Sequence, residues 1–291
     1  MKNVLDSISL VVDANINELL SNIKKQVAIP SVEGEPLKGA PFGKAVAESL
    51  EAVLTLGSEM GFSVKNYEGY VGTIEWGKGE EILGVLTHVD VVPPGDPAAW
   101  DTPPYEMTVK DGYVYGRGVA DDKGPLLSAL YGMYALKQSG FYPNKRVRFI
   151  IGTNEETNWG CMNYYKEHCE IPHASFSPDG MFTVVNREKG ILSIDFQKKL
   201  QTFGITIDCG EARNLVPSKA VAFLNCSLDA LNRAIDSCRQ SSKVTFAAES
   251  CNDGVKLICT GKSAHAMKPQ DGISAVMGIL KVISSREGIS E

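Results

Sequence analysis

Residues 82–90 read Ile-Leu-Gly-Val-Leu-Thr-His-Val-Asp, an almost unbroken apolar run that ends in a histidine and an aspartate. Apolar runs of this kind predict a strand that is buried on both faces of a sheet. Further strand-like runs alternate with segments of helical periodicity along residues 11–176, an order typical of an α/β fold. We therefore expect a mixed central sheet, at least partly parallel and flanked by helices, with functional loops at its strand ends.

The apolar pattern and the turn signals place the elements of this first region. Pro30 predicts the end of the first helix, and Gly61 is suited to a left-handed cap after the second. The expected helices are 11–27, 45–60, 126–138 and 158–167, and the expected strands are 62–65, 71–76, 82–89, 147–151 and 174–176. Residues 93–118 form a long connection rich in Pro, Gly and Asp, which favours a functional loop.

The pattern changes after Gly190 and predicts a separate α+β unit. We place the domain boundary near residue 189, with a first domain at 1–188 and a second at 189–291. The second domain is expected to hold strands 191–196, 220–226, 244–247 and 255–260 and helices 228–238 and 273–284.

Composition excludes several classes of partner. The 291 residues carry a formal net charge of −6, and no Lys/Arg run is interleaved with aromatic residues, so we expect no nucleic acid partner. No apolar stretch approaches the ~20 residues that a membrane span needs, and the first residues do not read as an export signal. Seven widely spaced cysteines without a Cys-x-x-Cys pair argue against a disulfide framework. The expected location is the cytoplasm.

Two of the predicted strand and helix ends carry candidate metal ligands. His88 ends the most apolar strand, and Asp90 is close enough in sequence to orient its imidazole. Asp121 and Asp122 lie between glycines directly before a predicted helix, where the helix N-terminus favours negative charge. An acidic helix cap is the alternative for this pair, since one of the two must cap if neither binds metal.

Two further strand ends supply three more carboxylates. Glu155 and Glu156 follow strand 147–151, and because adjacent side chains point in different directions, one can bind metal while the other accepts a proton. Asp179 follows strand 174–176 in the sequence Ser-Pro-Asp-Gly. The alternatives are a solvated acidic turn for the glutamates and an ordinary turn aspartate for Asp179.

These four motifs in this order resemble the cocatalytic metallopeptidases, the family of aminoacylases, glutamate-releasing carboxypeptidases, desuccinylases and bacterial dipeptidases of the PepV type. The likeness covers nearly the whole chain and is greatest to the PepV-type branch. It is carried by residues 87–93 (Thr-His-Val-Asp-Val-Val-Pro), 100–106 (Trp-Asp-Thr-Pro-Pro-Tyr-Glu), 120–125 (Ala-Asp-Asp-Lys-Gly-Pro), and 177–179 with 188–190.

The resemblance implies a zinc-exopeptidase-like catalytic domain and a site with two zinc ions, although manganese or cobalt also suit oxygen-rich ligands. The implied reaction is hydrolysis of the amide bond of a dipeptide or a small N-acyl amino acid by a water activated between the metals. The implied roles are one metal on His88 and Asp179, the other on Glu156, Asp121 as the bridge, Asp90 orienting His88, and Glu155 as general base.

The second domain resembles the lid domain of this family. His265, in Gly-Lys-Ser-Ala-His-Ala-Met-Lys-Pro at 261–269, matches a histidine that donates a hydrogen bond to the developing oxyanion. Asn214, in Ala-Arg-Asn-Leu-Val-Pro at 212–217, matches a residue that contacts the substrate. For both residues the alternative is an exposed polar loop.

One feature of the family pattern is missing. A final histidine ligand is expected after the lid motif, whereas the sequence stops at Glu291, so we expect an incomplete lid and an impaired second metal site. Cys161, His168, Cys169 and His173 do not have the spacing of a separate zinc site. A non-catalytic metal-binding or association module is the alternative function, and the Glu155–Glu156 pair favours the enzyme. The oligomeric state stays open, with a monomer favoured slightly.

Overall fold

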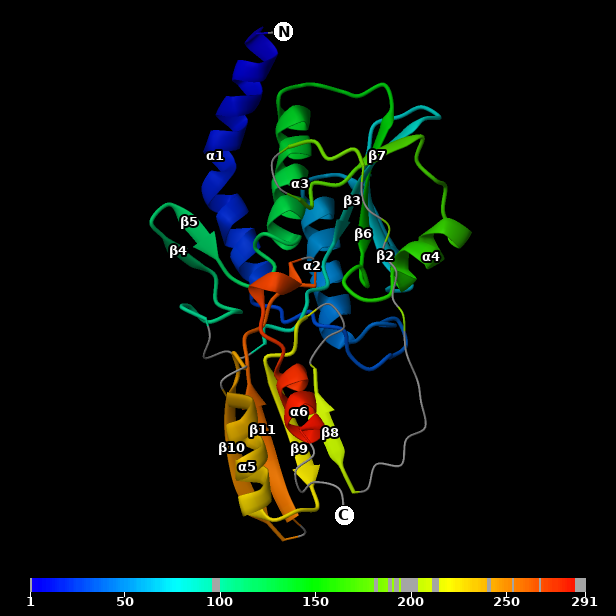
Figure 1. The fold of residues 1–291 in the computed structure, drawn as a ribbon. Coiled ribbons are helices and arrows are strands. Elements are labelled where there is room, and N and C mark those ends of the chain that lie inside the picture. Colours follow the sequence, from blue (N-terminus) through cyan, green and yellow to red (C-terminus); the bar gives the residue numbers. More distant parts are fainter. Residues whose placement is uncertain are drawn as a thin grey trace. The chain divides into compact units, whose positions relative to one another are not determined.

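The computed structural model describes residues 2–95, 100–180, 183–187, 190, 194, 204–210, 215–239, 242–252, 254–266 and 268–285. The chain forms two compact units, Met1–Arg187 and Glu188–Glu291 (Figure 1). Within the described residues, no helix has the length and apolar character needed to cross a membrane. All seven cysteines lie in described segments, and none is in a disulfide.

The first unit is built on a five-stranded mixed sheet of order β1-β2-β6-β3-β7. Strand β2 runs antiparallel to both β1 and β6, whereas β3 is parallel to both β6 and β7. The bounds are β1 Ser63–Tyr67, β2 Val71–Trp76, β3 Ile82–His88, β6 Arg146–Gly152 and β7 Ala174–Phe176, with helices α1 Lys2–Val27, α2 Lys44–Glu59, α3 Lys123–Gln138 and α4 Gly160–His168. The predicted mixed α/β fold is confirmed.

Helices cover both faces of this sheet (Figure 1). The larger core lies between the sheet and α1, α2 and α3, and its fully buried members include Leu50, Leu126 and Phe149. On the other face, Ile150 packs with Tyr165 of α4. The sheet is therefore covered on both faces by helices, which explains why β6 and most of β3 are almost continuously apolar.

The parallel strands β3, β6 and β7 determine where the polar segments that follow them lie. Thr87 pairs with Ile151 and His88 with Gly152, so β3 and β6 end level with each other. β7 runs in the same direction on the other side of β3. The segments that follow these three strands therefore leave the sheet at one edge, where the sequence has most of its candidate ligands.

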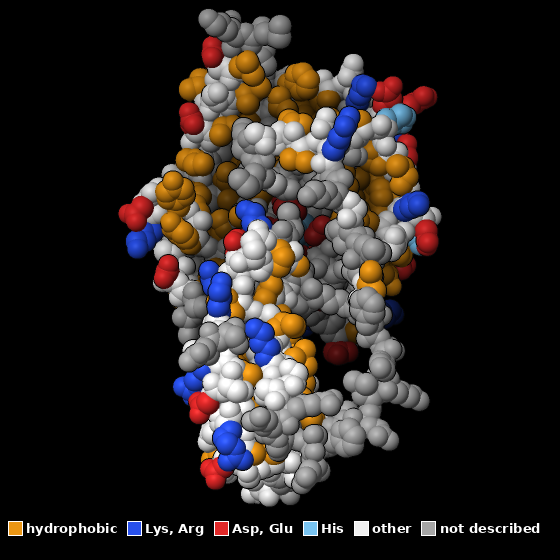
Figure 2. All heavy atoms as spheres, in the orientation of Figure 1, with side chains coloured by type: hydrophobic (Ala, Val, Ile, Leu, Met, Phe, Trp, Pro, Cys, Tyr) orange, Lys and Arg blue, Asp and Glu red, His pale blue; other side chains and the backbone are white. Residues whose placement is uncertain are grey.

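Two segments of the first unit differ from the prediction. Helix α1 begins nine residues before the expected start at Val11. The connection 93–118, expected to be irregular, contains a two-stranded hairpin of β4 Thr108–Lys110 and β5 Tyr113–Tyr115. Both α1 and the hairpin carry exposed apolar side chains, which colour this part of the surface in Figure 2: Leu5, Leu10, Val12 and Ile16 on α1, and Val109, Tyr113 and Tyr115 on the hairpin.

The second unit is a four-stranded antiparallel sheet of order β10-β11-β9-β8 with two helices packed on it. Its bounds are β8 Thr206–Cys209, β9 Lys219–Leu224, α5 Leu228–Arg239, β10 Thr245–Cys251, β11 Gly254–Thr260, a short 3₁₀ helix Pro269–Asp271 and α6 Ala275–Ser284. Strand β8 was not predicted, and the strand predicted at 191–196 lies outside the described residues except for residue 194. The designation of this unit as a lid domain stays a prediction.

Candidate metal centre

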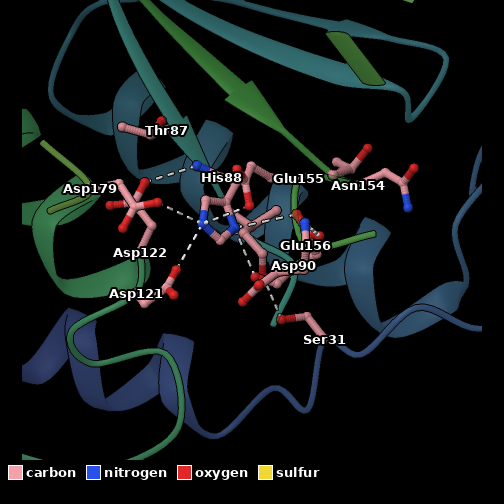
Figure 3. Close-up of polar contacts among 12 residues, drawn as sticks. Ser31, Thr87, His88, Asp90, Asp121, Asp122, Asn154, Glu155, Glu156 and Asp179 are labelled. Atoms are coloured by element: carbon pink, nitrogen blue, oxygen red, sulfur yellow. Dashed lines mark hydrogen bonds and ion pairs between the residues drawn. The ribbon is translucent and has the colours of Figure 1, made fainter. Parts of the chain in front are cut away.

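Four segments bring an imidazole and six carboxylates to the edge of the sheet (Figure 3). His88 is the last residue of β3, and Asp90 follows two positions later. The other carboxylates come from the segment before α3, the turn after β6 and the segment after β7, and they are Asp121, Asp122, Glu155, Glu156 and Asp179. His88 is only 1% exposed, so its ring is fixed by its surroundings.

The His88 ring faces carboxylates on both of its nitrogens. Nε2 lies 3.0 Å from Asp121 Oδ1, 3.3 Å from Asp179 Oδ2 and 3.9 Å from Glu155 Oε2. Nδ1 lies 2.9 Å from the backbone oxygen of Asp90 and 3.4 Å from its Oδ1. The nearer contact on the Nδ1 side is therefore a carbonyl, although the sequence had suggested the Asp90 carboxylate as the orienting group.

Asp90 links two of the segments. Its Oδ2 accepts the backbone N–H of Glu156 at 3.0 Å, which joins the residues after β3 to the turn after β6. In return, Glu156 Oε1 accepts the backbone N–H of Val92 at 3.3 Å. These two bonds fix the distance between the histidine and glutamate segments before any ligand is present.

Asp122 is part of the cluster, although the sequence did not separate its role from that of Asp121. Its side chain is completely buried, and its Oδ2 accepts the backbone N–H of His88 at 2.9 Å. Burial raises the pKa of Asp122 to about 8. Asp122 occupies the position before α3 without a side-chain capping bond, so the acidic-cap alternative does not describe it.

A buried lysine supports the same segment and was missed in the sequence. Lys123 is 1% exposed, and its Nζ donates to the backbone oxygens of Gln26 and Ile29, each at 2.8 Å. Burial lowers the pKa of Lys123 to about 7. The bonds attach the start of α3, and with it Asp121, to the end of α1. No local pattern signals this role, because a lysine at a helix start is ordinarily solvated.

The cluster has more negative charge than its own residues neutralise. Burial and repulsion from Asp121 raise the pKa of Glu156 to about 7, and burial followed by repulsion from Asp90 and Asp179 raises the pKa of Glu155. Burial lowers the pKa of His88, but its hydrogen bonds with Asp121 and Asp179 outweigh burial and raise it overall. Burial and the crowding of several carboxylates around a single imidazole together cause these shifts.

The donor set fits a divalent cation. One ligand atom from each of His88, Asp121 and Glu156 can be chosen so that all lie within 4.8 Å of one another. Two ligands that are each about 2 Å from a zinc ion lie roughly 3 to 4 Å apart, so small adjustments suffice. Two buried oxygens, Asp90 Oδ1 and Asp122 Oδ1, have no hydrogen-bond partner among the described residues, which adds to the uncompensated negative charge.

The remaining predicted residues belong to other parts of the chain. His265 belongs to the second unit, where it forms a β-bridge with Leu215. Asn214 lies outside the described residues. The four residues of the discounted zinc cluster have separate surroundings: Cys161 is buried, Cys169 is half-buried, His168 Nδ1 lies 2.9 Å from the Tyr164 backbone oxygen, and His173 Nδ1 accepts the backbone N–H of Ile82 at 3.3 Å.

Comparison with known proteins gives a consistent result. Putative dipeptidase YtjP of Bacillus subtilis (strain 168) is 38% identical over 274 residues, which cover 90% of this chain and 58% of the relative. Beta-Ala-Xaa dipeptidase of Lactobacillus delbrueckii subsp. lactis is 35% identical over 89% of this chain and 57% of the relative. The chain thus spans a little under three fifths of the length of these relatives.

Solved structures support the fold. The di-peptidase Dug1p of Saccharomyces cerevisiae superposes with a TM-score of 0.50 at 24% identity, over 57% of this chain and 38% of that one. Human carnosine dipeptidase 1 gives a TM-score of 0.50 at 23% identity, over 56% of this chain and 38% of that one. The model of peptidase family M20/M25/M40 matches residues 84–281, which include His88, all six carboxylates and His265. The chain belongs to peptidase family M20/M25/M40.

Proposed function

We propose that this chain carries the catalytic residues of a metal-dependent dipeptidase of the PepV type, which hydrolyses the amide bond of a dipeptide or a small N-acyl amino acid. The observation that carries the proposal is the placement of His88 among Asp121, Asp179 and Glu155 at one sheet edge. The relatives named as dipeptidases support the class of substrate. Two zinc ions are the proposed cofactor, with manganese or cobalt as substitutes.

The proposed ligand assignment is the one that the family resemblance implies. His88 and Asp179 would hold one metal, Glu156 would hold the other, and Asp121 would be shared by both. Asp121 is suited to the bridge because its Oδ1 already lies against His88 Nε2, while its charge raises the pKa of Glu156. Two bound zinc ions would supply an acidified water and a polarised substrate carbonyl.

Glu155 is the proposed general base. It lies next to Glu156 in the sequence, and its Oε2 is 3.9 Å from His88 Nε2, too far for a hydrogen bond. Burial raises its pKa, which makes the carboxylate a better proton acceptor near neutral pH. We assign to Glu155 the removal of a proton from the attacking water and its delivery to the leaving amine.

The second unit supplies two further proposed contacts. His265 donates a hydrogen bond to the substrate carbonyl oxygen as negative charge develops on it. Asn214 contacts the substrate beside it. We also propose that the second unit is a lid. The proposed location is the cytoplasm, where the seven cysteines would stay reduced. The proposed state is a monomer without nucleic acid or membrane partners.

Metal analysis combined with hydrolysis assays tests this function. The chain is stripped with a chelator, reconstituted with zinc and analysed by mass spectrometry, while a panel of dipeptides and N-acetyl amino acids is assayed in parallel. We expect bound zinc and hydrolysis that Glu155→Ala abolishes without loss of metal. Bound zinc with no hydrolysis of any substrate would support a metal-binding module instead, and absence of bound zinc would contradict both.

A further inference from the structure

Trp159 is a large aromatic residue in an unfavourable position. It lies in the turn between β6 and α4, directly before the first residue of α4. Its φ of +56° puts it in the left-handed region, which bulky residues rarely adopt, and its side chain is 51% exposed. A strained backbone that presents an exposed tryptophan suggests a functional role for the side chain.

The turn around Trp159 is fixed by a buried asparagine. The backbone oxygen of Asn154 accepts the Trp159 N–H at 2.9 Å, and its Oδ1 accepts the Gly160 N–H at 3.0 Å. Asn154 is 1% exposed, and a Cβ added to Gly160 would lie 2.9 Å from a ring carbon of Phe42. The position of Trp159 is therefore set by the packing of a turn that also carries Glu155 and Glu156.

A small cavity lies between Trp159 and the metal-ligand cluster. Its volume is about 80 Å³, and its polar side is formed by His88, Glu155 and Asp179, whose side chains converge in Figure 3. The apolar side is formed by Trp159, Leu86 and Met162. The proposed reaction needs the scissile carbonyl beside the polar residues, so this cavity is positioned for a group attached next to that carbonyl.

We propose that this cavity binds the side chain of the substrate residue that carries the scissile carbonyl, and that Trp159 makes it selective for a short aliphatic side chain. The inference rests on the proposed function. Its volume of about 80 Å³ is small beside the roughly 300 to 1,000 Å³ of pockets that bind drug-sized ligands, so a short side chain suits it better than a large ring. An acidic side chain would be repelled by Glu155, whereas methyl groups would gain apolar contact with Trp159 and Met162.

Binding of two amino acid hydroxamates tests the selectivity without requiring turnover. L-valine hydroxamate and glycine hydroxamate share a metal-binding group and differ only in the side chain. Each is titrated calorimetrically into the zinc-loaded full chain. We expect valine hydroxamate to bind about 10-fold more tightly than glycine hydroxamate, since a few methyl groups in an apolar pocket confer discrimination of this order.

Substitution of Trp159 assigns that preference to the indole. Trp159→Gly removes the side chain and relieves the positive φ, so the fold is retained, and the preference is expected to fall to about 2-fold or less. Trp159→Phe is expected to keep part of it. Tyr142→Ala is the matched control, because Tyr142 is also an exposed aromatic but lies beside Trp76, near the strand ends opposite to the metal-ligand cluster.

The outcomes separate the two levels of the proposal. Equal affinity of the two hydroxamates for the wild-type chain, or a preference that Trp159→Gly leaves intact, would overturn the role of Trp159 while the metal site stands. Failure of both hydroxamates to bind the zinc-loaded chain would overturn the proposed metal site, and the cavity's role with it.

Discussion

The two ends of strand β6 are both rich in charge, but only one of them is balanced. At its start, Arg146 Nη2 lies 2.7 Å from Glu170 Oε1, and Arg148 Nε lies 2.5 Å from Glu75 Oε2. Arg148 also donates to the Tyr165 hydroxyl at 3.2 Å. At the other end, carboxylates surround one histidine, and two buried carboxylate oxygens have no hydrogen bond among the described residues.

This difference indicates what each end does. Two arginines against two glutamates form a complete network that joins β2, β6 and the segment after α4, and such a network needs nothing further. The metal-ligand end has its carboxylates positioned by Asn154, Lys123 and the backbone of β3, yet their charge is uncompensated. A cluster of carboxylates whose negative charges are held close together and not neutralised by the protein is typical of a cation site.

The largest expected effect is on catalysis. We predict that Glu155→Gln lowers kcat for dipeptide hydrolysis about 10²- to 10⁴-fold, because it removes the proposed proton acceptor, while zinc content stays unchanged. Steady-state kinetics and metal analysis on the same preparation measure both quantities. Glu81 forms an ion pair with Lys145, the residue directly before β6, so Glu81→Gln is the control at the balanced end and should keep wild-type kcat. A fully active Glu155→Gln variant would remove Glu155 from the mechanism.

Next in size is the effect on metal affinity. Asp121→Asn keeps the shape of the side chain but removes the charge that is proposed to bridge two metals. Substitution of residues that only hydrogen-bond to a metal ligand lowers metal affinity by up to about 100-fold. Because Asp121 is proposed to bind the metal itself, we predict that zinc affinity falls by at least about 100-fold. Competition with a chromophoric chelator measures it. An affinity within a factor of two of the wild type would mean that Asp121 is not a ligand.

The balanced end should respond in stability and not in metal binding. Arg148→Met removes the donor to Glu75 and to the Tyr165 hydroxyl, although Glu75 keeps its ion pair with Arg146 and the hydroxyl its bond to the Glu170 backbone oxygen. We therefore expect a loss of about 1 to 3 kcal/mol in the free energy of unfolding. Zinc affinity should not change. The double variant Arg148→Met/Glu75→Leu should recover part of the loss, and urea denaturation with chelator present provides the measurement.

The smallest effect is a pH dependence that zinc should remove. Glu156 has a folded-state pKa of about 7 and Asp122 of about 8, both above the unfolded values, so the folded chain binds more protons than the unfolded chain between pH 5 and 7. The free energy of unfolding therefore falls as the pH rises through this window. We expect Tm of the metal-free chain to drop by a few degrees from pH 5 to pH 7.

Zinc should reverse this trend, because ligands must be deprotonated to bind metal and affinity then rises with pH. Thermal scans at matched pH values, with chelator and with zinc, give the comparison. If the Tm of the metal-free chain rose between pH 5 and 7, Glu156 and Asp122 would not be protonated in the folded chain at these pH values.

The sequence predicted the sheet well because its signals are local. The apolar runs at 71–76 and 82–88 and their punctuating glycines define strands that the structure places within a residue or two of expectation. The hairpin at 108–115 was missed because its strands are only three residues long. Two of the three side chains in each strand are exposed, so the strands show no apolar periodicity.

The site was predictable in part. Strand ends with carboxylates pointed to His88, Asp121 and Glu156, which the structure brings together. The contribution of Asp122 and Lys123 depends on long-range partners, the backbone of His88 and the end of α1, and these are invisible to spacing. The positive φ of Trp159 accompanies the bonds that Asn154 accepts from the N–H groups of Trp159 and Gly160, and no residue pattern signals that conformation.

The most direct test of the central claim is a crystal structure of the zinc-soaked chain with anomalous diffraction data collected at the zinc edge. We predict an anomalous peak about 2.0 to 2.1 Å from His88 Nε2, with Asp121 and Asp179 turned onto the same ion. A structure at saturating zinc that has no peak at this position, with His88 Nε2 still hydrogen-bonded to Asp121, would contradict the account.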